Sequence, residues 1–460
     1  MAASGSQPRN PRIQSTRAPR NRLAFVRFYL SNASSGVPGR TPVAGQKIRI
    51  EDLSNPILSD AQKAALAYGD SIETELSRKA VLAAAVAQTG LEDFGSDDFH
   101  ERLDLWLECA DEPNRTGLGR MIHFNDCVRY AATRLRINDY LRQHPEINDV
   151  EIRKPIIVIG LPRSGTTHLV NLIAADQRLR SMPLWEGQEP VPVAGEEPDA
   201  EGHDGRWHRC NAVWQNMRDN SPLLASMHPM KPDHIHEELE FLLPDFTSYN
   251  LEWVARAPKW RDYYLAHDQT SHYQGALLTG LRILQHHMPR DRWVLKCPQH
   301  LEQIGPLMQT FPDATIVVTH RDPVSVIQSA ATMLAYGART SYRSPDPEWY
   351  LEYWHDRVRR LLSASVRDRN LLPSDRTVDV LFHEFMADDV ATVEKIYEVA
   401  GLPMTNEAQA QIDDYMTAHP RGRDGQVVYD VRKDFGAEPE DLRRAFDFYF
   451  DEFDVRKEVS

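Results

Sequence analysis

Short apolar runs alternate with longer segments of helical periodicity over the C-terminal two thirds of the chain. The runs are rich in β-branched residues and lie at 155–160, 293–296, 314–319 and 378–382. The segment after the third run repeats apolar residues at helical spacing, as at Val324, Ile327 and Leu334. Strands buried on both faces are apolar throughout, so the pattern predicts an α/β fold with a parallel sheet between helices.

The preceding region reads as helical. Three segments have helical patterning, and Gly90 is a plausible end for the first: Asp60–Gln88, Phe99–Ala110 and Gly119–Gln143. We find no catalytic cluster there. We therefore expect a helical N-terminal cap over 51–150 and an α/β domain over 151–460. Within that domain, Leu184–Gly205 is predicted to be a loop insertion, 233–290 to be helical, and Leu442–Phe453 to be an amphipathic helix.

Charge is distributed unevenly along the chain. The formal net charge is −14, yet the first 50 residues contain no Asp or Glu and are rich in Arg. We predict a basic leader over 1–50, and a disordered tail, a misplaced start and an organelle-targeting segment all remain open. The acidic remainder argues against general nucleic-acid binding. The four cysteines are widely spaced, which excludes a disulfide framework and favours a reducing, cytoplasmic location.

The run at 155–160 leads into the sequence Gly160-Leu-Pro-Arg-Ser-Gly-Thr-Thr167, which nearly matches the phosphate-loop pattern GxxxxGK[ST]. Backbone amides of such a loop and the following helix N-terminus bind anions. The lysine of that pattern is replaced by Thr166, and the cation lies inside the loop at Arg163. This replacement disfavours hydrolysis of nucleoside triphosphates but keeps a loop that holds phosphate. The expected ligand-binding residues are Arg163, Ser164, Gly165, Thr166 and Thr167.

This loop resembles the 5′-phosphosulfate loop of sulfotransferases that use 3′-phosphoadenosine 5′-phosphosulfate (PAPS). A second similarity is Arg321 at a strand end with Ser329 eight residues on, which in the family hold the 3′-phosphate. A third is the sequence Lys296-Cys-Pro-Gln-His300, similar to the family's catalytic strand end. Arg421 and Arg423 resemble its basic loop over the 3′-phosphate. The resemblance, to the bacterial-type branch, implies a P-loop-like sulfotransferase sheet with PAPS as co-substrate.

The chemistry of sulfuryl transfer assigns roles to these residues. Arg163 and Lys296 are expected to stabilise charge on the leaving phosphate, so no metal is required. The acceptor hydroxyl or amine must lose a proton to a base. Candidates are Glu238, then Glu237, then His300, and the acidic run is expected to begin an α-helix. An acidic run at a helix start is more often solvated, and that alternative stays open.

The sequence therefore predicts a sulfotransferase acting on a small-molecule, lipid or sugar acceptor. The aromatic residues between the two cofactor motifs are candidates to line the acceptor site or simply to fill the core: Trp185, Phe246, Tyr249, Trp253 and Trp260. The alternatives are a nucleotide-dependent kinase or triphosphatase and a non-catalytic nucleotide-binding protein. No apolar run is long enough for a transmembrane segment. Homodimerisation is left open.

Overall fold

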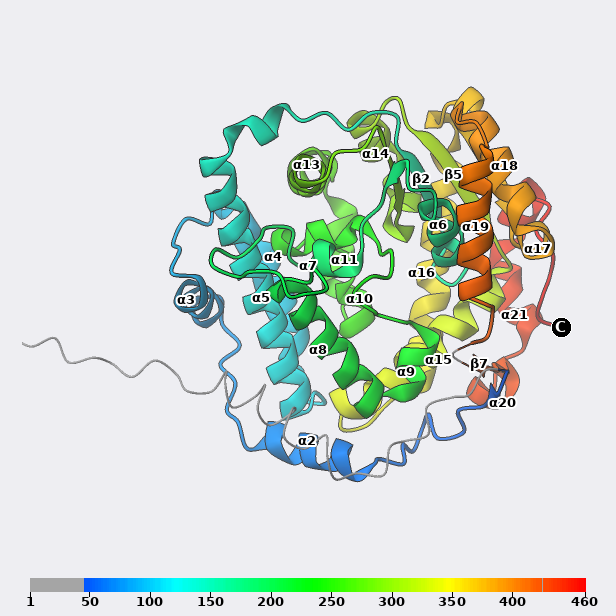
Figure 1. The fold of residues 1–460 in the computed structure, drawn as a ribbon. Helices are drawn as coiled ribbons and strands as arrows, with labels where there is room; N and C mark the ends of the chain where they lie inside the picture. The colour runs from blue at the N-terminus through cyan, green and yellow to red at the C-terminus, as the bar shows by residue number, and fades with distance from the viewer. Residues whose placement is uncertain (1–44, 424) are drawn as a thin grey trace, which may run out of the picture. The chain divides into compact units, whose positions relative to one another are not determined.

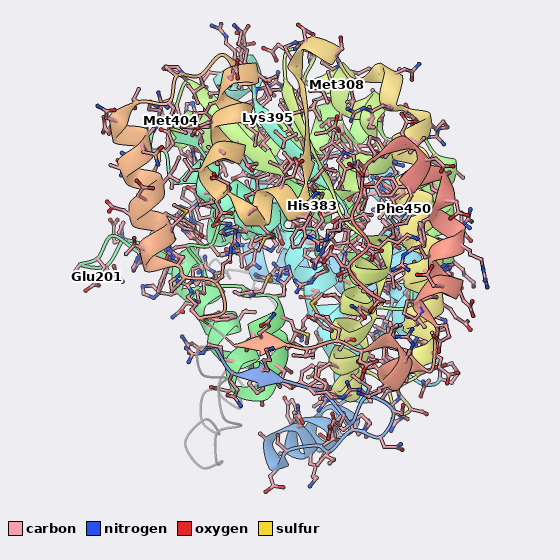
Figure 2. All side chains as sticks on the ribbon, turned by 90° about the vertical axis from the view of Figure 1, so that its right-hand side faces the viewer. Glu201, Met308, His383, Lys395, Met404 and Phe450 are labelled. Carbon is pink, nitrogen blue, oxygen red and sulfur yellow. The ribbon has the colours of Figure 1, made fainter. Side chains whose placement is uncertain are left out.

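The computed structural model describes residues 45–423 and 425–460 (Figure 1). Most of the basic leader predicted over 1–50 lies outside the described residues. Its last part is ordered, because β1 (Lys47–Ile48) pairs in parallel with β7 (Gln426–Val427). In Figure 2 the blue and orange-red strands lie side by side. Residues 47–48 thus belong to a small sheet, whose partner strand lies too far along the chain for a local pattern to reveal it.

Helices make up the region before the main sheet, as predicted. They are α2 (Asp60–Asp70), α3 (Arg78–Thr89), the 3-10 helix η1 (Asp97–Phe99), α4 (His100–Ala110), α5 (Gly117–Gln143) and the 3-10 helix η2 (Pro145–Asp149). The single helix expected over Asp60–Gln88 is wrong, since Ser77 starts a new helix by accepting a hydrogen bond from the Ala80 amide. Gly90 ends α3 in the left-handed conformation.

The predicted parallel sheet is confirmed. Its five strands lie in the order β3–β4–β2–β5–β6 and all pair in parallel. The strands are β2 (Ile156–Gly160), β3 (Leu179–Arg180), β4 (Arg292–Lys296), β5 (Thr315–His320) and β6 (Thr377–Leu381). The four predicted apolar runs are four of these strands. The fifth, β3, has only two residues, and no hydrophobic run marks it.

The continuous apolar character of the strands follows from burial on both faces. On β2, Ile156 and Val158 belong to the smaller hydrophobic core, whereas Ile157 and Ile159 belong to the larger one. Successive side chains of a strand point to opposite faces, so each face has its own core. The larger core also contains Trp106 of α4. The N-terminal helices and the sheet are therefore packed around one common core.

Helices cover both faces of the sheet (Figure 1). Beside the smaller core lie α6 (Thr166–Ala174), α17 (Phe382–Ala387), α18 (Asp389–Ala400) and α19 (Asn406–Ala418). Figure 2 faces this side, with His383 of α17 and Lys395 of α18 labelled. Beside the larger core lie α13 (Leu278–His287), the 3-10 helix η5 (Pro298–Glu302), α14 (Ile304–Thr310), α15 (Pro323–Ser341) and α16 (Pro347–Arg367).

The segment between β3 and β4 contains short helices and irregular chain. They are α7 (Leu184–Gln188), α8 (Gly205–Asn220), α9 (Pro222–Met227), the 3-10 helix η3 (Glu238–Asp245), α10 (Leu251–Val254), α11 (Pro258–Ala266), α12 (Thr270–His272) and the π-helix η4 (Tyr273–Leu277). The loop insertion predicted over Leu184–Gly205 begins with α7, and then neither helix nor strand follows until Gly205. Helical structure is confirmed for much of 233–290.

The C-terminal region carries the remaining short helices. They are the 3-10 helices η6 (Arg369–Leu371), η7 (Ser374–Arg376) and η8 (Arg444–Phe446), with α20 (Val431–Phe435), α21 (Pro439–Arg443) and α22 (Asp447–Glu452). The helix predicted over Leu442–Phe453 is confirmed up to Glu452, with the 3-10 turn η8 between α21 and α22. Its aromatic residues Phe446 and Tyr449 are buried in the larger core. In the described part of the chain, no helix has the length and apolar character needed to cross a bilayer.

The strand order places a switch point at the centre of the sheet. After β2 the chain forms β3 and β4 on one side, and then it crosses to β5 and β6 on the other. In open α/β sheets, ligands bind beyond the carboxyl ends of the strands at such a point. The carboxyl ends of β4, β2 and β5 are Lys296, Gly160 and His320. Every strongly matched motif of the sequence therefore converges on one edge of the sheet.

Candidate active site

The predicted phosphate loop joins β2 to α6. A side chain at Gly160 would place its Cβ 1.9 Å from Thr319 Oγ1 of the neighbouring strand, so only glycine fits there. Gly165 has φ of 84° and forms the N-cap of α6. The loop residue Arg163 also has a positive φ of 65°, which is uncommon outside glycine. This strained, tight loop is the geometry that a backbone anion site requires.

The N-terminus of α6 has no side-chain cap, so its first amides have no capping partner. Ser164 does not supply one, because its hydroxyl donates to Leu161 O at 2.5 Å and lies 2.9 Å from Thr319 Oγ1. The Ser164 side chain therefore braces the loop against β5. Thr166 is buried, whereas Thr167 is only partly buried. The uncapped amides and the positive end of the helix dipole can attract an anion here.

Lys296 ends β4 and faces this loop. Its side chain is almost completely buried, and its Nζ donates to Thr167 Oγ1 at 3.2 Å. The same ammonium forms an ion pair with Glu237 Oε1. An unpaired buried cation would be strongly unfavourable, so Glu237 balances the charge of Lys296. The structure thus brings together Lys296, Glu237 and the phosphate loop.

Glu238 and His300 face each other away from that ion pair. Glu238 Oε1 lies 2.8 Å from His300 Nε2, and Glu238 Oε2 accepts from the Lys296 amide at 2.8 Å. The other ring nitrogen of His300 lies 2.8 Å from Tyr273 Oη. His300 thus has a partner on both nitrogens, and neither Glu238 nor His300 is exposed by more than 1%. Their hydrogen bonds hold β4, η3 and η4 together.

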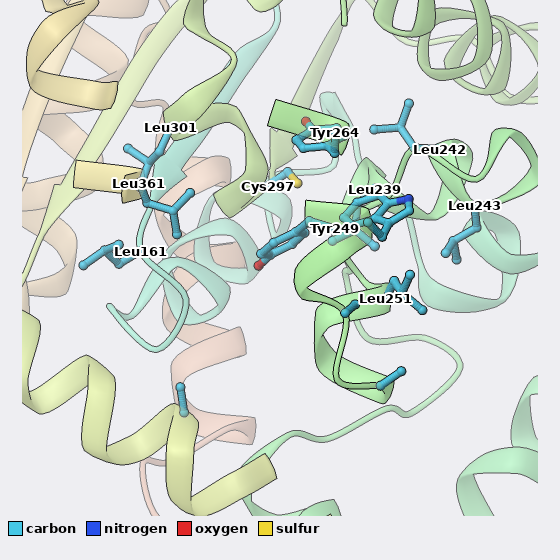
Figure 3. Close-up of a cluster of buried hydrophobic side chains, with 14 of the residues drawn as sticks. Leu161, Leu239, Leu242, Leu243, Tyr249, Leu251, Tyr264, Cys297, Leu301 and Leu361 are labelled. Atoms are coloured by element: carbon cyan, nitrogen blue, oxygen red, sulfur yellow. The ribbon is translucent and has the colours of Figure 1, made fainter. Parts of the chain in front are cut away.

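The acidic run does not begin an α-helix, and that expectation is wrong. Glu237 is the N-cap of the 3-10 helix η3, and Glu238 and Glu240 are buried in its first turn. The solvated alternative is wrong too, since all three carboxylates are at least nine-tenths buried. Leu239, which lies within the run, and Tyr249, which follows η3, are buried side chains of the larger core (Figure 3).

The predicted aromatic acceptor residues are mainly core. Phe246, Tyr249 and Trp260 are at most 1% exposed. Phe246 packs with Trp106 of α4, and Trp106 also contacts Trp260 edge-to-face. Trp185 and Trp253 are only half-buried, which leaves them accessible to a ligand. Of the two alternatives for these aromatic residues, the structure supports packing in the core for most of them.

Arg321 and Ser329 both lie next to the phosphate loop. Arg321 follows β5, and its Nη1 donates to Arg163 O at 2.5 Å. Arg163 Nε donates to Ser329 Oγ at 3.1 Å, and its Nη1 donates to Met227 O at 2.8 Å. Two motifs separated by more than 150 positions therefore meet through Arg163. The sequence predicted neither of these direct contacts.

The guanidinium of Arg321 has two further neighbours. It lies 3.9 Å from the centre of the Phe382 ring, and it forms a bidentate ion pair with Glu458 near the C-terminus, at 2.9 and 2.7 Å. Nothing in the sequence indicated Glu458. Its carboxylate accepts two hydrogen bonds from the Arg321 guanidinium, as the oxygens of a ligand phosphate would.

The predicted basic loop lies beside α17, α18 and α19. Arg421 donates to Met386 O at 3.0 Å and pairs with Asp389. Asp389 also lies 3.3 Å from His168 Nε2 of α6. Arg423 donates to Ala418 O at 3.2 Å. Arg421 is thus linked through Asp389 to the helix that follows the phosphate loop, and both guanidinium groups have protein partners.

Three histidines lie close enough to the cations of the site for their pKa values to respond to them. Burial and the positive charges of Arg163 and Lys296 lower the pKa of His228 to about 3. Burial, with Lys296 next, lowers the pKa of His234 to about 4. His236 likewise has a pKa well below its ordinary value, through burial and the charges of His228 and Lys296. These imidazoles are neutral at physiological pH.

A sequence model of the sulfotransferase family matches residues 155–406, more than half of the chain, so the protein belongs to the sulfotransferase family. The fold and the converging motifs agree with this assignment, and the protein is a sulfotransferase. No curated protein sequence matches it significantly.

Two solved structures are similar over most of the chain. Sulfotransferase STF9 from Mycobacterium avium is 26% identical with a TM-score of 0.75, and the match covers 85% of this chain and 100% of that one. Sulfotransferase STF1 from Mycobacterium tuberculosis H37Rv is 26% identical with a TM-score of 0.69, covering 80% of this chain and 98% of that one. Both matches extend well beyond the segment matched by the family model.

Proposed function

We propose that the protein transfers a sulfuryl group from PAPS to a hydroxyl or amine of a small-molecule acceptor. The observation that carries this proposal is the convergence of three motifs at adjacent strand ends. The phosphate loop follows β2, Lys296 ends β4, and Arg321 follows β5. Family membership supplies the reaction class, and the geometry supports the roles of individual residues.

The loop and Lys296 would hold the 5′-phosphosulfate group. The uncapped N-terminus of α6 and the hydroxyl of Thr167 fit an anion, and Lys296 Nζ already lies 3.2 Å from that hydroxyl. Arg321 and Ser329 would bind the 3′-phosphate, because Arg163 connects both to the loop. Arg421 and Arg423 would add positive charge beside it. Arg321 must then exchange Glu458 for the phosphate.

Glu237 is the base that we favour, ahead of Glu238 and His300. Its carboxylate contacts the Lys296 ammonium beside the loop, whereas Glu238 and His300 bond to each other. In the transfer, the acceptor oxygen or nitrogen forms a bond to sulfur, the sulfur–oxygen bond to the 5′-phosphate breaks, and Glu237 takes the acceptor's proton. Lys296 and Arg163 stabilise the charge that develops on the leaving phosphate oxygen. We propose that no metal takes part, since these two cations supply that charge.

Two other functions account for less of the geometry. A kinase or triphosphatase would need the loop lysine, and Thr166 occupies that position. A protein that only binds a nucleotide would not account for the match to a family of transfer enzymes. Family membership therefore favours an enzyme over a passive binding protein.

Calorimetry with adenosine 3′,5′-bisphosphate (PAP), AMP and ATP, without magnesium, tests this proposal. We expect PAP to bind the most tightly, and Arg321→Ala to weaken its binding by about 10- to 100-fold through loss of charge-assisted hydrogen bonds. Arg153→Ala is the matched control, because Arg153 is an exposed arginine at the opposite edge of the sheet. Preference for ATP, or equal binding of AMP and PAP, would contradict the proposal.

Transfer of labelled sulfate from PAPS then tests the reaction itself. We expect wild-type protein to release PAP in step with acceptor labelling and Glu237→Gln to lose at least about 100-fold in kcat. That variant should still bind PAP, at least as tightly as wild type, because it keeps Lys296 and loses the carboxylate that pairs with it. If Glu238→Gln loses activity while Glu237→Gln retains it, the assignment of the base is wrong but the reaction class stands.

A further inference from the structure

Polar atoms of two neighbouring side chains next to the site are buried without a hydrogen-bond partner in the described residues. They are Nδ1 and Nε2 of His236 and Oε2 of Glu240. His236 is 8% exposed and Glu240 is 5% exposed. A buried polar atom that lacks a partner is destabilising by about 1–3 kcal/mol. Three such atoms in contacting side chains mark a place where a ligand can contribute the missing hydrogen bonds.

Together with His228, these side chains form a row, His228–His236–Glu240, that starts near the phosphate loop. The rings of His228 and His236 lie 5.8 Å apart edge-to-face, and His236 Nδ1 lies 3.7 Å from Glu240 Oε1. Arg163 and Lys296 both lower the pKa of His228 through their charge, so the start of the row lies near the two cations of the site. The row runs from there towards α5, where Arg129 is the nearest cation to Glu240.

The protein fixes the row through its backbone. The His236 amide donates to Met182 O at 2.9 Å, and Pro183 and Ile235 form an isolated antiparallel bridge. Glu240 is held in the first turn of η3. Arg129 bonds to Asp126 and Tyr130, at 3.5 and 3.3 Å, and no such bond joins it to Glu240. The backbone that carries the unpartnered side chains is therefore fixed beside the site.

The chemistry of the row defines what it can bind. A neutral imidazole offers one N–H donor and one nitrogen acceptor, and a carboxyl group offers at least one acceptor oxygen. Glu237, next in sequence to His236, is the proposed base for the reacting hydroxyl. An acceptor with one hydroxyl would use Glu237 and leave His236 and Glu240 without partners. An acceptor with a neighbouring hydroxyl or amino group would satisfy them.

We infer that His236 and Glu240 bind a second hydroxyl or amino group of the acceptor, beside the one that is sulfated. The preferred acceptors are then vicinal diols and amino alcohols, a class that includes catechols and sugars. Monohydroxy phenols and sterols are poor acceptors. This inference rests on the proposed function, because it concerns the acceptor half of the same site.

The test uses two matched acceptor series with labelled PAPS. One contains phenol, 2-methoxyphenol and catechol, and the other contains cyclohexanol and trans-1,2-cyclohexanediol. In at least one series we expect kcat/KM for the compound with two hydroxyl groups to exceed that for its single-hydroxyl partner by about tenfold or more, the effect of one to two hydrogen bonds. 2-Methoxyphenol should behave like phenol, because it keeps the ortho oxygen of catechol but lacks the second donor.

Substitutions at His236 and Glu240 test whether this preference for diols depends on the row. His236→Leu and Glu240→Gln should each reduce the diol preference, His236→Leu to about twofold or less, and His236→Gln should restore part of it because an amide keeps a donor and an acceptor. His267→Leu and Glu394→Gln are matched controls at exposed positions. PAP affinity is measured for every variant, and unchanged values show that the cofactor side remains folded.

The outcomes separate the two hypotheses. If wild-type protein does not bind PAP, the proposed function fails. If it binds PAP but favours the single-hydroxyl acceptors, shows no preference or sulfates none of these compounds, the inference about the acceptor fails alone. If the diol preference is present but survives His236→Leu, the assignment to this row is wrong. Loss of the preference in His236→Leu with partial return in His236→Gln supports the inference.

Discussion

The guanidinium of Arg321 is held by the carboxylate of Glu458, in a bidentate pair with distances of 2.9 and 2.7 Å. The chain on either side of Glu458 is fixed as well, because the amides of Glu458 and Val459 both donate to Asp322 Oδ2. Glu458, two residues before Ser460, therefore pairs with the cation that we propose to bind the 3′-phosphate of PAPS. A phosphate that binds Arg321 has to compete with this carboxylate.

The competition predicts that Glu458→Gln tightens PAP binding. The pair is partly exposed, and such pairs contribute up to about 1 kcal/mol, so we expect a gain of about two- to fivefold. Calorimetry on the variant and on Glu452→Gln, an exposed carboxylate near the same end of the chain, measures the difference. Weaker PAP binding in Glu458→Gln would mean that Glu458 orients Arg321 for the phosphate instead of competing with it.

The buried pair of Lys296 and Glu237 predicts coupled effects on stability. Removal of either partner leaves a buried charge without its counterion, which lowers the free energy of unfolding by about 3–5 kcal/mol. Lys296→Met and Glu237→Gln should therefore each destabilise the protein, whereas the double variant should lose much less than the sum. Urea denaturation of the four proteins checks this. Additive losses would show that the two side chains do not interact.

Burial raises the pKa of Glu240 from 4.5 to about 7. Between these values the folded protein keeps a proton that the unfolded chain has lost, so the free energy of unfolding falls as pH rises through this window. Glu240→Gln stays neutral and avoids this loss. We expect its stability gain over wild type to grow from none below pH 4.5 to on the order of 3 kcal/mol at pH 8.

Denaturation of wild type and Glu240→Gln at pH 4, 6 and 8 measures this difference. Titration of the neutral histidines affects both proteins alike, and thus cancels in the comparison. Glu394→Gln, exposed on α18, should show no such pH dependence. A gain that is equal at all three pH values would contradict a raised pKa.

If arginine and lysine stabilise the transition state without a metal, the activity of the enzyme should not be affected by chelators. We expect kcat to change by less than about twofold after dialysis against EDTA, because Arg163 and Lys296 supply the charge that a metal provides in other transferases. Lys296→Ala should lower kcat by at least about 100-fold under the same conditions. Loss of activity in EDTA with recovery on adding magnesium would show that the cations are insufficient.

The sheet and the phosphate loop could be predicted because their signals are local. The β-branched run at 155–160 is buried on both faces, and the following glycines permit a turn that few other residues can adopt. Lys296 could be singled out because a lysine at the end of an apolar strand needs a partner. In each case a few consecutive residues carry the physical constraint.

The pairings within the site could not be predicted, because they join distant segments. The sequence named Glu238, Glu237 and His300 as candidate bases, but it could not show that His300 and the Lys296 amide are the partners of Glu238. The η3 segment also adopts 3-10 geometry, which its composition does not distinguish from an α-helix. Glu458 lies in a polar tail whose sequence has no signal for a contact with Arg321.

The contact between Gly160 and Thr319 links the two halves of the cofactor site. A methyl group at position 160 would overlap the Thr319 hydroxyl, and that hydroxyl also braces Ser164 of the loop. Any relative that carries alanine at position 160 must therefore have a smaller residue at position 319, and it must replace the brace on its loop. Among homologous sequences these positions should evolve as a pair, with glycine at one and a hydroxyl-bearing residue at the other kept or lost together.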